Sequence, residues 1–301
     1  MPGDEGKPLS VPKTHADLAA HQTVFAAGVL ANYTVVVSGG GSGIGRATAW
    51  LAARLGAQVI VTGRSESKLV DVCSEITDLG LACDYRTLDI RDIEQVDTVL
   101  ADIDKAHNGF DLLVNSAGGQ FPQAAIDFEK KGWDVVVNTN LNGTWHMMQA
   151  AAQLWRERQT PGSIVNIVVV SQGLFGVAHT IAARAGVIAF SERVAVEWAP
   201  YSIRANCIAP GAIETEGWAV YPELARQRYP RTNPTMRQGS PWEIAEAIVF
   251  VGGPAGRFIN GATLVVDGGG QHWGEIWTTG KPEYFASATR LWDDAAEDES
   301  T

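Results

Sequence analysis

The amino-acid sequence predicts a single-domain α/β fold of the Rossmann type, with a doubly wound parallel sheet. Residues 35–37 are three valines, a β-branched run typical of a strand buried on both faces, and a glycine cluster and a helix starting near Arg46 follow directly. Each of the next strands precedes a predicted helix, which favours parallel strands joined by helical crossovers. With 301 residues, of which 46% are hydrophobic, the chain is long enough for one large domain.

The pattern of apolar residues places the elements in order along the chain. After the strand at 35–37, it predicts strands over residues 58–62, 82–88, 111–115, 163–170, 203–208 and 263–266. It predicts helices over residues 47–55, 67–79, 93–106, 131–158 and 178–198. Residues 1–30 are expected to form an arm with one short helix around 14–27, residues 31–270 the Rossmann-type domain, and residues 271–301 a tail. On the long helix, we expect core or subunit contacts from Trp133, Met147, Met148 and Trp155.

The glycine cluster after the first strand predicts a phosphate-binding turn. Gly39, Gly43 and Gly45 carry no Cβ and adopt positive φ easily, so backbone amides and the positive end of the helix come close to a pyrophosphate. The spacing is that of a TGxxxGxG pattern, with Ser38 in the threonine place and the strand–turn–helix context that the pattern requires. The alternative is a glycine-rich turn without a ligand. We expect a dinucleotide to contact Ser38, Gly39, Gly41, Ser42, Gly43, Ile44 and Gly45.

The end of the second strand indicates which dinucleotide is bound. An acidic residue there would bind the 2′-hydroxyl of NAD, but this chain has Gly63 followed by Arg64. A guanidinium suits a 2′-phosphate, so we expect NADP(H); the alternative is a solvated arginine at a strand end. After the third strand, Asp89 is placed to contact the adenine amine, with the amide of Ile90 beside it.

Composition excludes several classes of function. The net charge of -11 and the pI of about 5.0 oppose nucleic-acid binding and provide no basic patch for an anionic membrane. The three cysteines show no CxxC spacing, so we interpret them as core thiols of a reducing compartment and predict no metal site. The sequence shows neither a secretory pattern at residue 1 nor a membrane-spanning apolar run, and we expect a cytoplasmic protein.

Several motifs in a fixed order identify a family. SGGGSGIG at 38–45, Asp89-Ile90, NSAG at 115–118, Asn140 and PGAIET at 210–215 resemble the short-chain dehydrogenase/reductase family across residues 30–270. The resemblance implies that the cofactor is lined by Asn115, Ala117, Gly118, Pro210 and Gly211. It implies that the Ile213 amide and the Thr215 hydroxyl bind the nicotinamide carboxamide. It also implies a homodimer or homotetramer, because the two long helices usually pair between subunits in this family.

The catalytic positions depart from the family's usual YxxxK pattern. HTIAARAG at 179–186 places Thr180 where the family has its proton-donating tyrosine and Arg184 where it has lysine. A threonine hydroxyl is far less acidic than a phenol, and arginine stays protonated at any working pH, so proton transfer at position 180 should be poor. The usual catalytic serine place holds Val169, and Ser171 lies two residues later.

This departure favours hydride transfer to the β-carbon of an enoyl-CoA thioester. The developing charge then spreads onto the thioester oxygen, where hydrogen-bond donors stabilise it, and water delivers the proton. HTIAARAG resembles the HxxAAR segment of trans-2-enoyl-CoA reductases and is similar to that of 2,4-dienoyl-CoA reductases. By this resemblance Arg184 holds the nicotinamide ribose, Asn140 positions a water, and the thioester oxygen meets His179, Thr180 or Ser171. The acyl group is expected to meet the turn formed by Gly119, Gln120 and Phe121, and the implied ligands are NADP(H) and an acyl-CoA.

Alternatives remain at individual residues and for the activity. His179 has the alternative of a packed or capping residue, and Thr180 that of a helix N-cap. Arg226, Arg228 and Arg231 would meet CoA phosphates or form the exposed face of a short lid helix. An alcohol or aldehyde dehydrogenase, similar to citronellol dehydrogenase-like members around HxxAAR, would need His179 as its proton acceptor. A third interpretation is a nucleotide-binding subunit that has lost catalysis.

Overall fold

The computed structural model of the chain describes residues 14–170, 176–221, 223 and 228–274. Its centre is a parallel sheet whose seven strands follow the order β3-β2-β1-β4-β5-β6-β7. The strands are β1 (Thr34–Ser38), β2 (Gln58–Gly63), β3 (Cys83–Thr87), β4 (Leu112–Asn115), β5 (Gly162–Ile167), β6 (Ile203–Pro210) and β7 (Thr263–Val266). The strand order reverses between β1 and β4, and ligands of open α/β sheets bind at such a reversal, beyond the carboxyl ends of the strands. The predicted doubly wound, single-domain α/β fold is confirmed.

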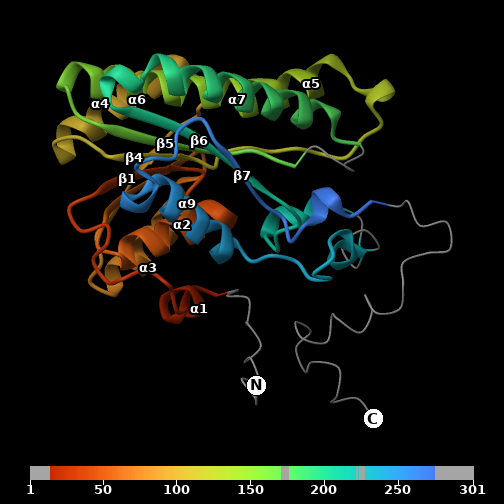
Figure 1. Cartoon of the computed structure of the whole chain (residues 1–301), viewed down its shortest axis with the longest axis horizontal. Coiled ribbons are helices and arrows are strands. Elements are labelled where there is room, and N and C mark those ends of the chain that lie inside the picture. The colour runs from red at the N-terminus through yellow and green to blue at the C-terminus, as the bar shows by residue number, and fades with distance from the viewer. Residues whose placement is uncertain (1–13, 171–175, 222, 224–227, 275–301) are drawn as a thin grey trace, which may run out of the picture.

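Helices cover both faces of the sheet and make three layers (Figure 1). One face carries α4 (Ile93–His107), α5 (Lys130–Val137), α6 (Thr144–Arg158) and α7 (Ala178–Glu197). The other face carries α2 (Gly43–Arg54), α3 (Glu66–Asp78) and α9 (Pro241–Gly252), with the short α1 (His15–Ala20) packed against α2. Three apolar clusters fill the spaces between the layers, one around Trp50 and Trp242, one around Trp155 and a smaller one around Val187. Burial of these apolar side chains is the main force that holds the layers together.

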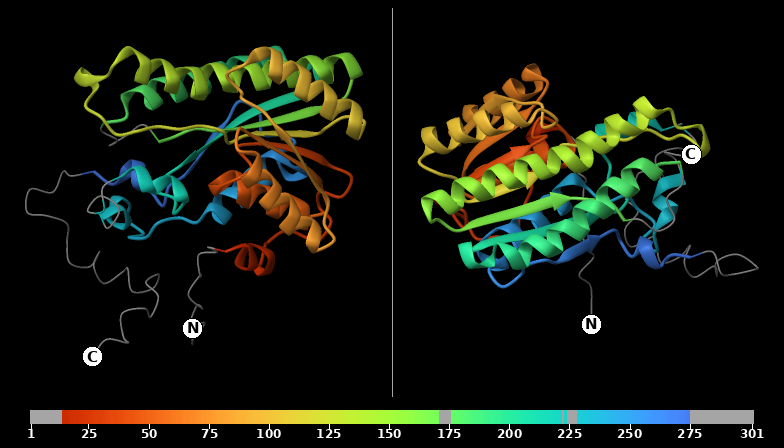
Figure 2. Two further views of the ribbon diagram at one scale, coloured as in Figure 1. Left: turned by 180° about the vertical axis from the view of Figure 1, so that it is seen from behind. Right: turned by 90° about the horizontal axis from the view of Figure 1, so that it is seen from above.

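The long helix predicted over 131–158 is interrupted. Seen from above, α5 and α6 form one rod beside α7 (Figure 2). Between them lies a π-helical turn, Asn138–Gly143, which widens the rod where Asn140 sits. A π-turn of this kind often marks a functional position in a helix. Trp133 is 39% exposed, whereas Met147, Met148 and Trp155 on α6 are fully buried, as core residues should be.

Several predicted boundaries were wrong. The helix expected to start near Arg46 begins at Gly43, and the helix expected over 14–27 is only His15–Ala20. The strand expected over 163–170 ends at Ile167, because the chain leaves the sheet toward the site. The prediction missed α9, although Ser240 and Glu243 form a capping box around Pro241 at its start.

Candidate active site

The turn after β1 adopts a shape that only glycine accommodates. Gly39 and Gly43 have φ values of +73° and +51°. A Cβ on Gly39 would lie 2.7 Å from the backbone nitrogen of Ala117, and one on Gly45 would overlap the carbonyl oxygen of Gly39. The turn therefore packs tightly against the segment after β4. This cradle fits the diphosphate of a dinucleotide, which requires backbone at the amino end of a helix without intervening side chains.

The remaining residues of the turn support this shape. Ser38 ends β1, and its hydroxyl accepts a hydrogen bond from the Ala117 amide at 3.4 Å. A Cβ on Gly41 would lie 3.0 Å from the Cβ of Lys68 on α3. Ser42 is the N-cap of α2 in extended conformation, but its side chain makes no capping hydrogen bond, and Ile44 packs on the core. The sequence-predicted turn residues thus lie together at the start of α2.

Arg64 and Asp89 lie at neighbouring strand ends. Arg64 follows β2 and is exposed, in the loop before α3. Hydrogen bonds from Arg91, and to a lesser extent the charge of Arg64, hold the pKa of Asp89 below its usual range despite partial burial. The Ile90 carbonyl lies 3.0 Å from Nδ1 of His146 on α6, which fixes this loop against the long rod. A cation therefore stands where the 2′-phosphate was predicted.

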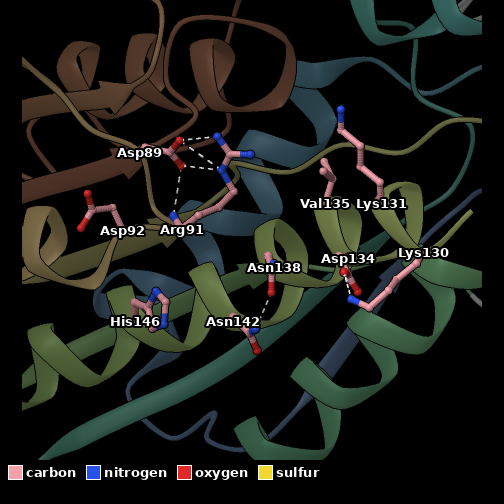
Figure 3. Close-up of a pocket in the computed structure, with 10 residues that line it drawn as sticks. All are labelled: Asp89, Arg91, Asp92, Lys130, Lys131, Asp134, Val135, Asn138, Asn142 and His146. Atoms are coloured by element: carbon pink, nitrogen blue, oxygen red, sulfur yellow. Dashed lines mark hydrogen bonds and ion pairs between the residues drawn. The ribbon is translucent and has the colours of Figure 1, made fainter.

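A polar hollow of about 940 Å³ adjoins Asp89 (Figure 3). It lies between the loop after β3 and the outer side of the α5–α6 rod, with Asn138, Asn142 and His146 on its wall. The Arg91 guanidinium forms an ion pair with the Asp89 carboxylate, with Nη2 and Oδ2 2.5 Å apart. Lys130 forms an ion pair with Asp134 along α5. Each of these four charges is thus paired within the protein.

The glycines after β4 are tied to Asn140. The Oδ1 of Asn140 accepts from the Gly119 amide at 3.0 Å, and its Nδ2 donates to the Gly119 carbonyl at 2.9 Å. Asn115 behaves differently, because its Nδ2 donates to Oδ1 of Asn166 at 2.8 Å inside the sheet. The side chain of Asn140 therefore fixes the turn, and the π-turn of the long rod places it there.

Thr180 and Arg184 join the same network. Thr180 is fully buried, and its Oγ1 accepts from Asn140 Nδ2 at 2.8 Å and from Arg184 Nε at 3.3 Å. Arg184 also donates to the carbonyl of Ile167, and a Cβ on Gly118 would overlap its guanidinium. Burial lowers the pKa of Arg184 to about 10, so it remains charged at neutral pH. The structure brings these predicted site residues together beneath the turn at 118–119.

His179 lies in an aromatic cluster. Its ring stacks on Phe128 with centroids 4.6 Å apart, and Phe121 meets it edge-on at 4.6 Å. Its Nδ1 accepts from the Thr180 amide at 2.8 Å. Burial lowers its pKa, and hydrogen bonds with the backbone of Val177 and Phe121 oppose this shift in part. The environment is that of a packed, neutral histidine.

A tyrosine from the segment after β6 reaches the predicted acyl-binding turn. Nε2 of Gln120 donates to the hydroxyl of Tyr221 at 2.5 Å, and Tyr229 packs edge-on against Tyr221. Burial, with help from Tyr221, raises the pKa of Tyr229 to about 12. Ser171 and Arg226 lie outside the described residues. Arg228 and Arg231 are exposed, and the Arg231 carbonyl accepts from the Trp273 indole at 3.0 Å.

The segment after β6 folds back over the glycine turn. Pro210 ends β6, and the amide of Gly211 donates to the Val266 carbonyl at 3.0 Å. Ile213 is buried and pairs with Gly239. The methyl carbon of Thr215 lies 3.4 Å from where a Cβ of Gly43 would be. Thr215, predicted to hold the nicotinamide, and Gly43, predicted to hold the diphosphate, thus lie against each other.

Across the described parts of the chain, no group of three or more His, Cys, Asp or Glu side chains is arranged to hold a metal ion. In the same residues, no helix combines the length and the apolar character needed to cross a bilayer.

Sequence reasoning missed two contacts of this site. Phe128 supplies the ring that stacks on His179, and Arg46 pairs with Glu216 at 2.9 Å. Neither contact follows a local spacing, since 51 and 170 residues separate the partners in the chain. Only the folded arrangement reveals them.

Comparison with known proteins gives one family model. Residues 39–271 match the model described as "Enoyl-(Acyl carrier protein) reductase". Among curated relatives, a probable 2,4-dienoyl-CoA reductase of Bacillus subtilis is 36% identical over 78% of this chain and 95% of its own length. A 3-oxoacyl-[acyl-carrier-protein] reductase of Thermotoga maritima is 34% identical over 78% of this chain and 96% of its own length.

Solved structures are similar over the same region. The citronellol catabolism dehydrogenase AtuB of Pseudomonas aeruginosa is 37% identical with a TM-score of 0.75, covering 83% of this chain and 100% of that one. An actinorhodin polyketide ketoreductase solved with NADPH is 28% identical with a TM-score of 0.75, covering 82% of this chain and all of its own.

Proposed function

Because the chain belongs to the short-chain dehydrogenase/reductase family and is an oxidoreductase, we propose that it uses NADPH to reduce the activated carbon–carbon double bond of an enoyl-CoA or dienoyl-CoA thioester. The observation that carries the proposal is the arrangement around Thr180. This hydroxyl is buried and accepts hydrogen bonds from Asn140 and Arg184. A group held in this way positions its neighbours and is a poor proton donor. The 36% identity to a probable 2,4-dienoyl-CoA reductase supports the same substrate class.

The contacts described above indicate which residues would hold NADPH. We assign the diphosphate to the turn at 39–45, the 2′-phosphate to Arg64, the adenine to Asp89 and Ile90, and the carboxamide to Ile213 and Thr215. Arg184 would hold the nicotinamide ribose, and its charge would favour an anionic oxygen nearby. When bound, NADPH supplies the hydride.

The residues of the site then act on the thioester. The Gly118–Gly119 turn, fixed by Asn140, gives the acyl group a rigid wall, with Phe121 and the His179 cluster behind it. In this arrangement His179 is a positioning residue, because its ring packs between two phenylalanines. The network of Asn140, Thr180 and Arg184 presents fixed dipoles and a positive charge, which stabilise an enolate oxygen. Solvent then protonates the α-carbon.

A direct assay tests this function. NADPH consumption is followed with a short and a long trans-2-enoyl-CoA and with a 2,4-dienoyl-CoA, and NADP reduction with a terpenoid alcohol. We expect turnover of the thioesters, and turnover of the alcohol alone would refute the proposal. Replacing Thr180 with alanine should leave most of the activity. A loss of about 100-fold or more, as for an essential acid, would contradict the role given to Thr180.

A second candidate is an NADP-dependent alcohol or aldehyde dehydrogenase. The contact between Gln120 and Tyr221 favours it, because Tyr221 brings a phenol to the predicted substrate turn. The 37% identity to the citronellol catabolism dehydrogenase AtuB supports it as well. Tyr221→Phe distinguishes the two candidates. Under the thioester proposal this variant keeps kcat within a few fold, whereas a phenol that takes the alcohol proton would cost about 100-fold or more.

For the assembly, we propose a homo-oligomer formed through the long helices. Val135 and Trp133 on α5 and Val196 on α7 are large apolar side chains that are 39–75% exposed in the single chain. Exposed apolar side chains of this size on neighbouring helices suit a subunit contact. Sedimentation of the purified protein tests this proposal.

A further inference from the structure

A carboxylate caps the amino end of α2, where the proposed diphosphate would sit. Glu216 begins the short 3-10 helix Glu216–Val220, directly after Thr215. Its Oε2 accepts from the Gly43 amide at 3.1 Å, and its Oε1 pairs with the Arg46 guanidinium at 2.9 Å. Both carboxylate oxygens are thus bound to the first turn of α2, although 173 residues separate Glu216 from Gly43.

No side chain of the N-cap residue competes with this carboxylate for the first amides of α2. Ser42, the N-cap, contributes no side-chain hydrogen bond to the helix. The first amides of a helix attract an anion, and a carboxylate is the protein's own equivalent of a phosphate oxygen. Glu216 therefore takes the place of a cap that the local sequence does not provide.

The pair between Glu216 and Arg46 leaves part of Arg46 unsatisfied. The side chain of Glu216 is 53% exposed and that of Arg46 is 19% exposed. The Nε of Arg46 is buried and has no hydrogen-bond partner among the described residues. A larger anion with several oxygens would therefore meet unused donor capacity at Arg46.

We propose that Glu216 competes with the dinucleotide diphosphate for the amino end of α2 and thereby lowers the affinity for the cofactor. The inference rests on the proposed binding of NADP(H) by the glycine turn. A carboxylate and a diphosphate repel each other, and both need the Gly43 amide and the nearest cation, Arg46. Binding of the dinucleotide displaces the Glu216 carboxylate from α2. When the oxidised dinucleotide dissociates, the carboxylate returns.

The position of Glu216 links this exchange to the predicted acyl-binding turn. Five residues after Glu216, Tyr221 contacts Gln120 of the predicted acyl-binding turn. Release of Glu216 from α2 therefore frees the start of the segment that touches this turn. The same residue would thus adjust cofactor affinity and the anchoring of that segment.

The test is a binding titration of the full chain with NADPH and with NADP, followed by cofactor fluorescence or calorimetry. Glu216→Gln keeps the size and the hydrogen-bond acceptor but removes the charge. We expect its Kd to fall about three- to fivefold, the size typical of removing one partly exposed charge contact at a helix terminus. Glu192→Gln is the matched control, because Glu192 is 47% exposed and pairs with Arg193 on α7. Its Kd should match that of the natural chain.

A second variant examines the cation. Arg46→Gln should weaken NADPH binding, and in that background Glu216→Gln should change the Kd by less than it does alone. An unchanged or higher Kd for Glu216→Gln, with clear binding by the natural chain, overturns the competition alone. Failure of the natural chain to bind NADPH or NADP overturns the proposed cofactor itself, and the competition with it.

Discussion

Replacing Arg184 with methionine should leave the stability of the cofactor-free protein nearly unchanged while it destroys cofactor binding. Burial lowers the pKa of Arg184 to about 10, from about 12.5 for a free guanidinium. At about 1.4 kcal/mol for each tenfold change in proton affinity, the charged side chain opposes folding by about 3.5 kcal/mol. Methionine loses the hydrogen bonds to the Ile167 carbonyl and to Thr180, at about 1.5–2 kcal/mol each because the donor is charged. The two effects nearly cancel, so the free energy of unfolding should change by less than about 1 kcal/mol.

The pH dependence of this difference has a definite sign. Because the folded-state pKa of Arg184 lies below that of the unfolded chain, the full penalty applies below pH 10 and is relieved as the pH rises through that value. The stability of Arg184→Met relative to the natural chain should therefore be constant near neutrality and decrease above about pH 10. Urea unfolding of the cofactor-free protein measures it, and an NADPH titration measures the loss of binding.

Arg204→Met is the matched control. Arg204 is also partly buried, but it donates to the carbonyls of Val251, Gly252 and Ile259 and to the Ser163 hydroxyl at 2.8–3.0 Å. Removing this fully used guanidinium leaves several acceptors without partners and should destabilise the fold by about 3 kcal/mol. If Arg184→Met destabilises the protein to a similar extent, Arg184 stabilises the fold, and its proposed role in holding the cofactor loses this support.

Three further substitutions test other parts of the candidate active site. Arg64→Ala should raise the KM for NADPH about tenfold or more and leave that for NADH nearly unchanged, and equal effects on both would refute a 2′-phosphate contact. Gly45→Ala should abolish NADPH binding without unfolding the domain, since the new Cβ overlaps the Gly39 carbonyl; a titration and circular dichroism check both parts. Burial lowers the pKa of His179 in the folded state. The buried neutral ring therefore contributes its full stability above about pH 6.5, and the free energy of unfolding decreases as the pH falls from there toward the folded-state pKa. His179→Phe should therefore flatten the decline of the urea midpoint in acid, and an unchanged slope would contradict its burial as a neutral ring.

The sequence predicted those features of the fold that depend on local pattern. Strand–helix alternation gave the parallel sheet, and the last strand was placed at its observed bounds, Thr263–Val266. The π-turn at Asn138–Gly143 was not predictable, because it inserts into a helix whose apolar period continues on both sides. The helix α9 does carry a local signal, because Ser240 and Glu243 have capping-box spacing and Pro241 stands at the first helical position.

In the candidate site, too, residues in local motifs were predictable and contacts between distant segments were not. Motif spacing named Asn140 and Arg184 as candidate site residues, and the structure places both beside the glycines after β4. Contacts between distant segments were beyond reach. Glu216 on α2 and Tyr221 on Gln120 depend on how the segment after β6 folds back, and no spacing in the sequence encodes that path.

The absence of a phenol at position 180 changes what the site offers to a substrate. Thr180 accepts hydrogen bonds from Asn140 and Arg184, so the network supplies a fixed positive field in place of a proton relay. Alcohol oxidation needs a base, and a guanidinium with a pKa of about 10 does not serve as one at neutral pH. Double-bond reduction needs only stabilisation of an anionic oxygen, which this field provides. The rate of enoyl thioester reduction should therefore stay nearly constant between about pH 6 and 8, whereas alcohol oxidation, which needs a base, would rise with pH over that range.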